Sequence, residues 1–322
     1  MKQLLDTHAV PSALSHTGSL APYIDLSGSL CAFEHYLVRE RGLSPATVAN
    51  YLPAVRRFLT ERFGTGPLLL RELGASDVSR SILRYARSTS PGSARVRVSA
   101  LRAYLRFALR EGEIETDLAA AVPAVASWRL ASVPSSLNSE QIEKLLNSCD
   151  QSTLVGQRDH TILLLLARLG LRGGEIVAMR LGDLDWRAGE ITVHGKGQRR
   201  DRLPLPQDVG QALATYLSKG RPSCESRRVF VRLREPYRGF ANVTAVCSIV
   251  RRALERAGLC PKRKGAHLLR HSLASEMLRQ GASLAEIAQI LRHNSLTTTE
   301  IYAKVNVSAL RKLAPPWPGG EV

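Results

Sequence analysis

The stretch AHLLRHSLASEMLRQGASLAEIAQILRHNSLTTTEIYAKV, residues 266–305, sets polar side chains into an apolar helical pattern. His267 and Arg270 stand three positions apart, so in a helix they share a face. An arginine inside an apolar run needs an anionic partner if it is buried, and a phosphate matches its planar guanidinium. His293 and Tyr302 follow along the chain. The stretch predicts three short helices whose polar side chains suit a phosphate.

The same residues allow other interpretations. His267 and His271 stand four positions apart and could bind a metal, as in the HExxH pattern. Leu268 occupies the place of the acid in that pattern, and no third acidic or cysteine ligand is apparent, so the sequence predicts no metal site. Taken alone, His271 is typical of a buried, hydrogen-bonded helix histidine, and Tyr302 of a half-buried packing residue.

The composition favours a polyanionic partner. The 322 residues carry 45 Lys and Arg against 28 Asp and Glu, a net charge of +17. Nucleic acid is the first candidate partner and an anionic membrane surface the second. No apolar run approaches the roughly 20 residues of a membrane span, and we expect no signal peptide. The five cysteines are scattered without CxxC spacing, so we expect a cytoplasmic protein with reduced thiols and no membrane partner.

The first part of the chain predicts a small all-helical domain. Residues 1–25 are polar and irregular, typical of a loose arm, and residues 26–118 carry four helical patterns. In one of them Ser44 suits an N-cap and Pro45 the first helical position. The pattern at 93–112 turns arginines away from its apolar face, which indicates either solvated charge or, as we expect, phosphate contacts. The arginines expected to bind DNA are Arg95, Arg97, Arg102, Arg106 and Arg110.

Prolines and small residues at 119–136 indicate a linker, and a second, mixed α/β domain is expected at 137–314, followed by a tail at 315–322. The segment GEITVHGKGQRRDRLPLP alternates around a glycine turn, which predicts a β-hairpin. The other segments of this domain are mostly helical. The predicted fold class is therefore mainly α with a small β-sheet.

Three more residues of the second domain suit phosphate chemistry. Arg172 follows an apolar helix and a glycine turn, and Glu175 comes three residues later. Arg172 could be a surface arginine paired to Glu175. Lys196 lies at the tip of the expected hairpin and could belong to a solvated basic loop. Its surroundings lack the GxxxxGK[ST] pattern of a P-loop.

Together the segments resemble the tyrosine recombinases, or phage integrases, including the Xer-type enzymes. GLSPATVANYLPAVRRFL is similar to the core-binding domain of that family, and LGLRGGEI to its first arginine box. GKGQRRDRLPLP is similar to its lysine hairpin, HLLRHSLASEML to its H-x-x-R box, and LRHNSLTTTEIY to its last histidine and nucleophile boxes. Their order and spacing also agree, over nearly the whole chain.

The sequence departs from the family pattern at two points. Arg292 stands where glycine usually precedes the histidine, so it either shifts His293 or adopts a compatible backbone conformation. Two glycines follow Arg172 where one helix-favouring residue is commoner, which weakens the start of that helix. Neither departure removes a side chain of the expected catalytic set.

The resemblance implies an N-terminal SAM-like core-binding domain and a C-terminal catalytic domain that form a C-shaped clamp on DNA. It implies a site-specific recombinase or integrase that cleaves and rejoins DNA through a 3′-phosphotyrosine, without a cofactor. Glu175 and His271 would support the catalytic residues. The catalytic set that the resemblance implies is Arg172, Lys196, His267, Arg270, His293 and the nucleophile Tyr302.

The implied partners are double-stranded DNA with specific recombination sites and a homotetramer, with a related recombinase as a further partner. The implied setting is integration, excision or transposition of a mobile element by a cytoplasmic, nucleoid-associated protein. The residues after Tyr302 suggest an amphipathic helix that docks either on a neighbouring subunit or on its own domain. Two alternatives remain: a non-catalytic DNA-binding regulator of the same fold and a type IB topoisomerase.

Overall fold

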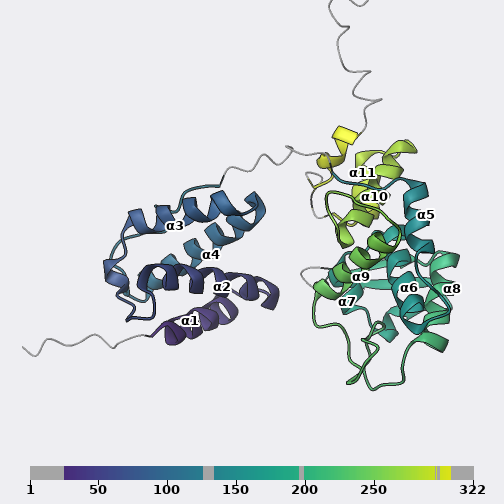
Figure 1. The fold of residues 1–322 in the computed structure, drawn as a ribbon, viewed down its shortest axis with the longest axis horizontal. Helices are drawn as coiled ribbons and strands as arrows, with labels where there is room; N and C mark the ends of the chain where they lie inside the picture. Colours follow the sequence, from purple (N-terminus) through teal and green to yellow (C-terminus); the bar gives the residue numbers. More distant parts are fainter. Residues whose placement is uncertain (1–24, 126–133, 196–198, 294, 296–297, 306–322) are drawn as a thin grey trace, which may run out of the picture. The chain divides into compact units, whose positions relative to one another are not determined.

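Internal contacts divide the chain into two units, Met1–Trp128 and Arg129–Val322 (Figure 1). The computed structural model describes residues 25–125, 134–195, 199–293, 295 and 298–305. Most of the expected arm, part of the expected linker, the expected helix after Tyr302 and the tail at 315–322 lie outside these residues. Each unit has a hydrophobic core of its own.

The first unit is all helical. Ser44 caps α2 as predicted, because its hydroxyl accepts a hydrogen bond of 3.3 Å from the backbone N–H of Thr47. Pro53 lies inside α2 without splitting it. The elements are α1 (Leu26–His35), a π-helical turn (Tyr36–Glu40), α2 (Pro45–Phe63), a 3-10 turn (Leu70–Glu72), α3 (Ala75–Ser88) and α4 (Pro91–Arg110).

The core of the first unit lies where α4 packs against α2 and α1. Phe33 and Tyr104 are fully buried and meet edge to face, with ring centroids 5.2 Å apart. Ala119 and Val122 are buried in the same core. The first unit therefore extends beyond residue 118, the end predicted from the sequence, because these apolar residues pack on its core.

Arg97 corrects the prediction for α4. Its side chain is 2% exposed and donates hydrogen bonds to Glu61, at 2.9 Å, and to Ser81, at 2.8 Å. Its guanidinium also lies over the ring of Tyr85, 4.5 Å from the centroid. Arg97 therefore belongs to the interior of the first unit, and its assignment as a DNA contact is wrong.

The row of arginines on α4 that were predicted to bind DNA has four further members, and these differ in their surroundings. Arg95 and Arg106 are exposed. Arg102 is half-buried and donates a 2.8 Å hydrogen bond to the Val122 carbonyl oxygen. Arg110 forms ion pairs with the carboxylates of Glu40 and Glu111. Arg95 and Arg106 are therefore the members of the row whose exposed side chains best suit a phosphate.

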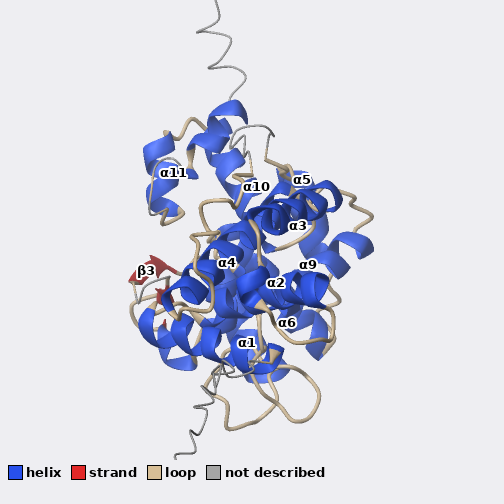
Figure 2. Ribbon diagram, turned by 90° about the vertical axis from the view of Figure 1, so that its left-hand side faces the viewer, coloured by secondary structure: helices blue, strands red, loops and turns tan. Residues whose placement is uncertain are grey.

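The second unit is mostly helical with one small sheet, as predicted (Figure 2). Its helices are α5 (Ser139–Asn147), α6 (Leu154–Arg168), α7 (Gly173–Ala178), α8 (Gln207–Thr215), α9 (Val243–Arg256), α10 (Ala266–Arg279) and α11 (Leu284–Ile290), with 3-10 turns at Leu181–Asp183 and Glu300–Val305 and a π-helical turn at Tyr216–Gly220. Its strands are β1 (Leu184–Asp185), β2 (Glu190–His194) and β3 (Arg200–Pro204).

Helix α6 lies at the centre of this unit because it is apolar on nearly every side. Ile162, Leu163 and Leu165 are fully buried, and α5, α8, α9 and α10 all contact the helix. Among the described helices none is both long enough and apolar enough to cross a membrane.

The predicted hairpin is present in an antiparallel sheet of order β1-β2-β3. Val193 lies opposite Asp201, and Ile191 opposite Leu203, so these side chains share the face turned toward the core. The hairpin ends in a 2.8 Å hydrogen bond from the Gly195 N–H to the Arg199 carbonyl oxygen. Lys196 lies outside the described residues.

Candidate active site

Arg172 is held at the start of α7 by Glu175. The Arg172 backbone N–H and its Nη1 each donate a 2.8 Å hydrogen bond to that carboxylate, and Nη2 donates to the carbonyl oxygen of Arg292 at 3.0 Å. Glu175 is buried, whereas the Arg172 side chain is 36% exposed. The pairing with Glu175 that the sequence suggested therefore fixes a partly exposed guanidinium instead of a mobile surface side chain.

The doubled glycine after Arg172 has a packing explanation at its first position. A Cβ on Gly173 would lie 2.5 Å from Val243 Cγ2 and 3.3 Å from Ala266 Cβ. Helix α7 can therefore approach α9 and α10 closely only with glycine there. A Cβ on Gly174 would meet no atom within 4 Å.

Arg270 is buried beside Arg172 and is held by backbone carbonyls. It is 5% exposed, and its two Nη atoms donate to the carbonyl oxygens of Gly170 and Leu291. Burial, with Arg172 and Arg292 nearby, lowers the pKa of Arg270 to about 10, so it stays charged at neutral pH. A guanidinium has five N–H donors, so Arg270 keeps others for an anion.

His267 and His293 are uncharged at neutral pH. His293 is half-buried, whereas His267 is more exposed. Partial desolvation and the positive charges of Arg270 and Arg172 lower the pKa of both, that of His293 to about 4. His293 Nδ1 lies 2.7 Å from the hydroxyl of Thr299, which is itself buried. Both imidazoles can therefore donate one hydrogen bond and accept another.

Tyr302 is a packing residue and a hydrogen-bond partner together. It is 1% exposed and packs with Ala274, Leu278, Ile287 and Leu291 of α10 and the α11 region. Its hydroxyl lies 2.6 Å from His271 Nδ1. Burial raises the pKa of Tyr302 to about 12, so the phenol is neutral in this structure.

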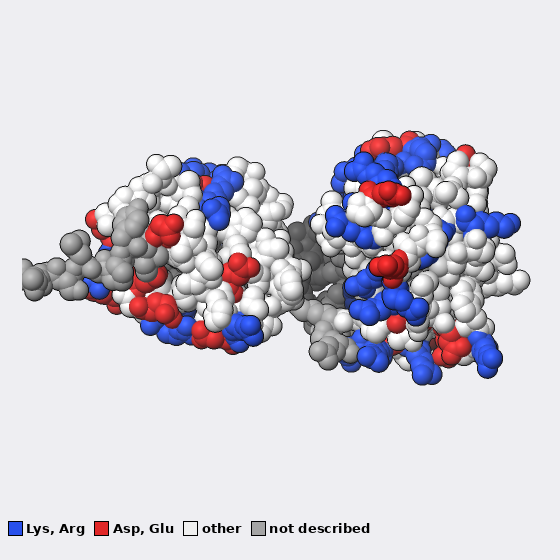
Figure 3. All heavy atoms as spheres, turned by 90° about the horizontal axis from the view of Figure 1, so that it is seen from below, with Lys and Arg blue, Asp and Glu red and all other residues white. Residues whose placement is uncertain are grey.

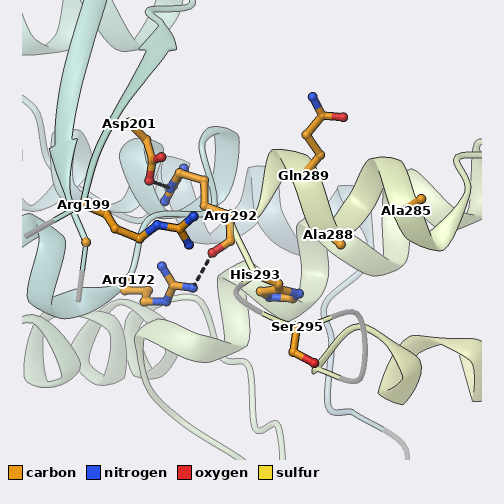
Figure 4. A pocket seen from close by; sticks show the side chains of 10 residues that line it. Arg172, Arg199, Asp201, Ala285, Ala288, Gln289, Arg292, His293 and Ser295 are labelled. Atoms are coloured by element: carbon orange, nitrogen blue, oxygen red, sulfur yellow. Dashed lines mark hydrogen bonds and ion pairs between the residues drawn. The ribbon is translucent and has the colours of Figure 1, made fainter. Parts of the chain in front are cut away.

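A cationic pocket of ≈ 550 Å³ opens between the hairpin and α11 (Figure 4). Figure 4 shows the guanidinium groups of Arg172, Arg199 and Arg292 gathered there. His293 and Asp201 also line the pocket, whereas His267, Arg270 and Tyr302 are not among its lining residues. The structure thus brings Arg172 and His293 to one surface.

The part of the chain that the structure describes contains no group of three or more His, Cys, Asp or Glu side chains placed to hold a metal ion. Positive charge at the pocket comes from arginines instead.

No sequence pattern pointed to Asp201 or Arg199 as site residues. Arg292 stood out only because it occupies a position where the family usually has glycine. Arg292 adopts a φ of 53°, the one positive φ among the described residues other than glycine. Its Nη2 donates a 2.8 Å hydrogen bond to Glu175. An arginine at a position where a turn favours glycine was the available signal. The presence of an acid within its reach could not be read from the sequence.

Two family models match the chain. Residues 30–112 match the phage integrase N-terminal SAM-like domain, and residues 135–309 match the phage integrase family. Among the relatives, y4rA of Sinorhizobium fredii, named as an integrase/recombinase, is 49% identical over 288 residues, which span 89% of this chain and 70% of that protein. Tyrosine recombinase XerD of Mycobacterium tuberculosis is 32% identical over 312 residues, 91% of this chain and 97% of XerD.

Solved structures share the fold. XerH recombinase bound to its palindromic difH substrate has a TM-score of 0.67 at 20% identity, covering 88% of this chain and 83% of XerH. A lambda integrase dimer bound to a core site has a TM-score of 0.64 at 20% identity, covering 93% of this chain and 100% of that one. Both domains, the order of the sequence boxes and these relatives agree: the chain belongs to the phage integrase family of tyrosine recombinases.

Proposed function

We propose that this protein is a site-specific DNA recombinase that cleaves and rejoins DNA through a 3′-phosphotyrosine at Tyr302. The observation that carries the proposal is the fixed Arg172 guanidinium, which shares a pocket with the neutral His293 and is held by the buried Glu175. The arginine-rich pocket suits a phosphodiester. Its chemistry needs positive charge at the non-bridging oxygens and neutral groups that can move protons.

In the proposed reaction the Tyr302 oxygen attacks phosphorus in line as the bond to the 5′ oxygen breaks. The bond energy is kept in the phosphotyrosine, so a free 5′-hydroxyl can reverse the step without a cofactor. Lys196 gives its proton to the leaving 5′ oxygen. The tyrosine proton goes to a neutral histidine, and His271 Nδ1 lies 2.6 Å from the hydroxyl.

Arg172 and Arg270 bind the two non-bridging oxygens, which gather negative charge in the transition state. His267 and His293 add hydrogen-bond donors. Because Tyr302 is buried and does not line the pocket, DNA binding has to bring the hydroxyl and the phosphate together. We infer that the 3-10 turn Glu300–Val305 shifts when DNA binds.

The proposed partners are double-stranded DNA with cognate sites and three further copies of this chain. Lysines and arginines spread over the face of the second unit that Figure 3 shows. The net charge of +17 favours a polyanion. Related folds were solved on DNA, including a lambda integrase tetramer on a Holliday junction. The two units would close around the duplex as a C-shaped clamp, in the cytoplasm at the nucleoid, to integrate, excise or transpose a mobile element.

The test uses a nicked duplex made from the ends of the genetic element that carries the gene. Wild-type protein should form an adduct that survives denaturing electrophoresis. Tyr302→Phe keeps the packed ring and removes only the nucleophile, so it should bind this duplex equally well and form no adduct. An adduct with Tyr302→Phe would show that Tyr302 is not the nucleophile.

A second assay separates the proposed function from its alternatives. On a plasmid carrying two cognate sites, a recombinase yields recombined circles. Relaxation without recombination would indicate a topoisomerase, and binding with neither product would indicate a regulator.

A further inference from the structure

The backbone of Arg292 is in a conformation that glycine adopts more readily than any other residue. Its φ of 53° lies in the left-handed region, which residues with a Cβ rarely adopt. The residue follows the last turn of α11, where its N–H donates to the Gln289 carbonyl oxygen at 2.9 Å. Glycine would fit this turn without strain, so the retained side chain has to contribute something that glycine lacks.

The Arg292 side chain lies inside the protein between two acids. It is 7% exposed, and its Nη2 donates a 2.8 Å hydrogen bond to Glu175. Its Nε lies 3.8 Å from Asp201 Oδ2, as the dashed line in Figure 4 marks. Nε and Nη1 are buried without a hydrogen bond to any described atom. A small approach of Asp201 would therefore give Nε the partner that a buried donor requires.

Asp201 is the acid on the hairpin that can make this contact. Along β3 the exposure alternates, with Arg200 and Arg202 exposed and Asp201 half-buried opposite the buried Val193. The inward face of β3 thus carries a carboxylate near the end of the strand. The chain between β2 and β3 includes Lys196. Whatever holds Asp201 also limits the movement of this end of the hairpin.

We propose that Arg292 is a positioning residue that docks the β2–β3 hairpin against the end of α11 through Asp201. Glu175 fixes the Arg292 guanidinium, and the guanidinium in turn fixes Asp201 and the end of the hairpin. The Arg292 side chain therefore links the hairpin to Glu175, the carboxylate that also holds Arg172. The consequence for cleavage rests on the proposed function, in which Lys196 protonates the leaving oxygen. The docking itself is independent of it.

The first test measures docking without DNA. Amide hydrogen exchange of the hairpin should speed up by at least about tenfold in Arg292→Gly and Asp201→Ala, because local opening becomes easier. Arg292→Gly relieves the left-handed backbone, so general loss of folding is not expected from it. The matched control is Arg202→Ala. Arg202 is the next residue on β3, and its Nη1 lies 3.7 Å from Glu190 on the exposed face. Exchange in this control should match that of wild type.

The second test measures cleavage of the nicked duplex with either oxygen or sulfur at the bridging 5′ position. On the oxygen substrate, Arg292→Gly and Asp201→Ala should each cleave about 10- to 100-fold more slowly, the size of loss expected from a misplaced catalytic group. The double variant should be no slower than the slower single variant, because both remove one contact. Sulfur leaves without a proton, so both variants should recover on that substrate.

Hairpin exchange in Arg292→Gly equal to that of wild type would overturn the docking. Wild-type cleavage by Arg292→Gly, or equal cleavage defects on the oxygen and sulfur substrates, would overturn the role of this docking in placing Lys196. Failure of the proposed function looks different, because wild-type protein would then form no adduct on either substrate. The exchange result would still decide the docking.

Discussion

His271 and Tyr302 are joined by a hydrogen bond, with 2.6 Å between Nδ1 and the phenol oxygen. The two residues come from α10 and from the 3-10 turn Glu300–Val305, and their ring centroids lie 5.5 Å apart. Burial lowers the pKa of His271 to about 4 and raises that of Tyr302 to about 12. Both groups are therefore neutral near pH 7. With its hydrogen on Nε2, the imidazole can accept the tyrosine proton at Nδ1.

Replacing His271 should separate proton handling from DNA binding. His271→Phe keeps a ring in the same space and removes the acceptor, so adduct formation should slow by about 10²-fold or more while DNA affinity stays unchanged. The matched control is His160→Phe, at another partly buried histidine whose pKa is also lowered by burial. Equal rates for His271→Phe and wild type would show that the hydrogen bond has no part in cleavage.

The half-buried histidines His271 and His293 should make folding sensitive to acid. The pKa values of His271 and His293 are lowered from 6.5 to about 4 in the folded protein, so between these values the unfolded chain binds more protons. Stability should therefore be full above about pH 6.5 and fall, by on the order of a few kcal/mol, as the pH drops to 4. Chemical denaturation across this range measures the slope. The double variant His271→Gln/His293→Gln should show a shallower slope; an unchanged slope would contradict this assignment.

Arg97 shows which features of the fold can be predicted from the sequence and which depend on tertiary packing. The helix, its start and its apolar stripe follow from the residue spacing. Ala94, Leu101 and Tyr104 are buried and stand three, four and seven positions from Arg97, so Arg97 shares their inward face, and the prediction that it points outward overlooked this spacing. Its partner Glu61 belongs to another helix, so only the tertiary structure reveals why a charge is tolerated there.

The candidate site divides in the same way. Local contacts were predictable, because the Arg172–Glu175 pair and the hairpin form within short stretches of sequence. The Tyr302–His271 and Arg292–Asp201 contacts join residues 31 and 91 positions apart in the sequence. They depend on how α10, α11 and the hairpin pack, which no local pattern contains.

Arg97 and Arg106 should behave differently on substitution, although both lie on α4. Arg97→Ala leaves Glu61 and Ser81 without their buried partner, so unfolding free energy should fall by about 2–4 kcal/mol. Arg106→Ala should change it by less than about 0.5 kcal/mol, because the side chain is exposed. If Arg106 contacts a phosphate, its loss should reduce the salt dependence of DNA binding by about one unit. The reverse pattern, with Arg106 stabilising the fold, would contradict the assignment of both residues.

Cleavage should proceed in excess EDTA. Arg172 and Arg270, with Lys196, carry the positive charge that a metal supplies in other phosphoryl transfers. The rate of adduct formation on the nicked duplex, with and without chelator, is the measurement. Loss of activity in EDTA that magnesium or zinc restores would contradict this mechanism and favour His267 and His271 as metal ligands.

Lys196→Ala should distinguish a general acid from a basic loop residue. A loop residue that contacts phosphate would lower DNA affinity modestly and reduce the salt slope by about one unit. A general acid would leave binding nearly intact and slow cleavage by roughly 10²–10⁴-fold. With sulfur at the bridging position the thiolate leaves without a proton, so Lys196→Ala should recover most of its rate. Arg172→Ala should not recover, because its guanidinium acts on the non-bridging oxygens. Equal defects of Lys196→Ala on both substrates would assign Lys196 to a solvated loop.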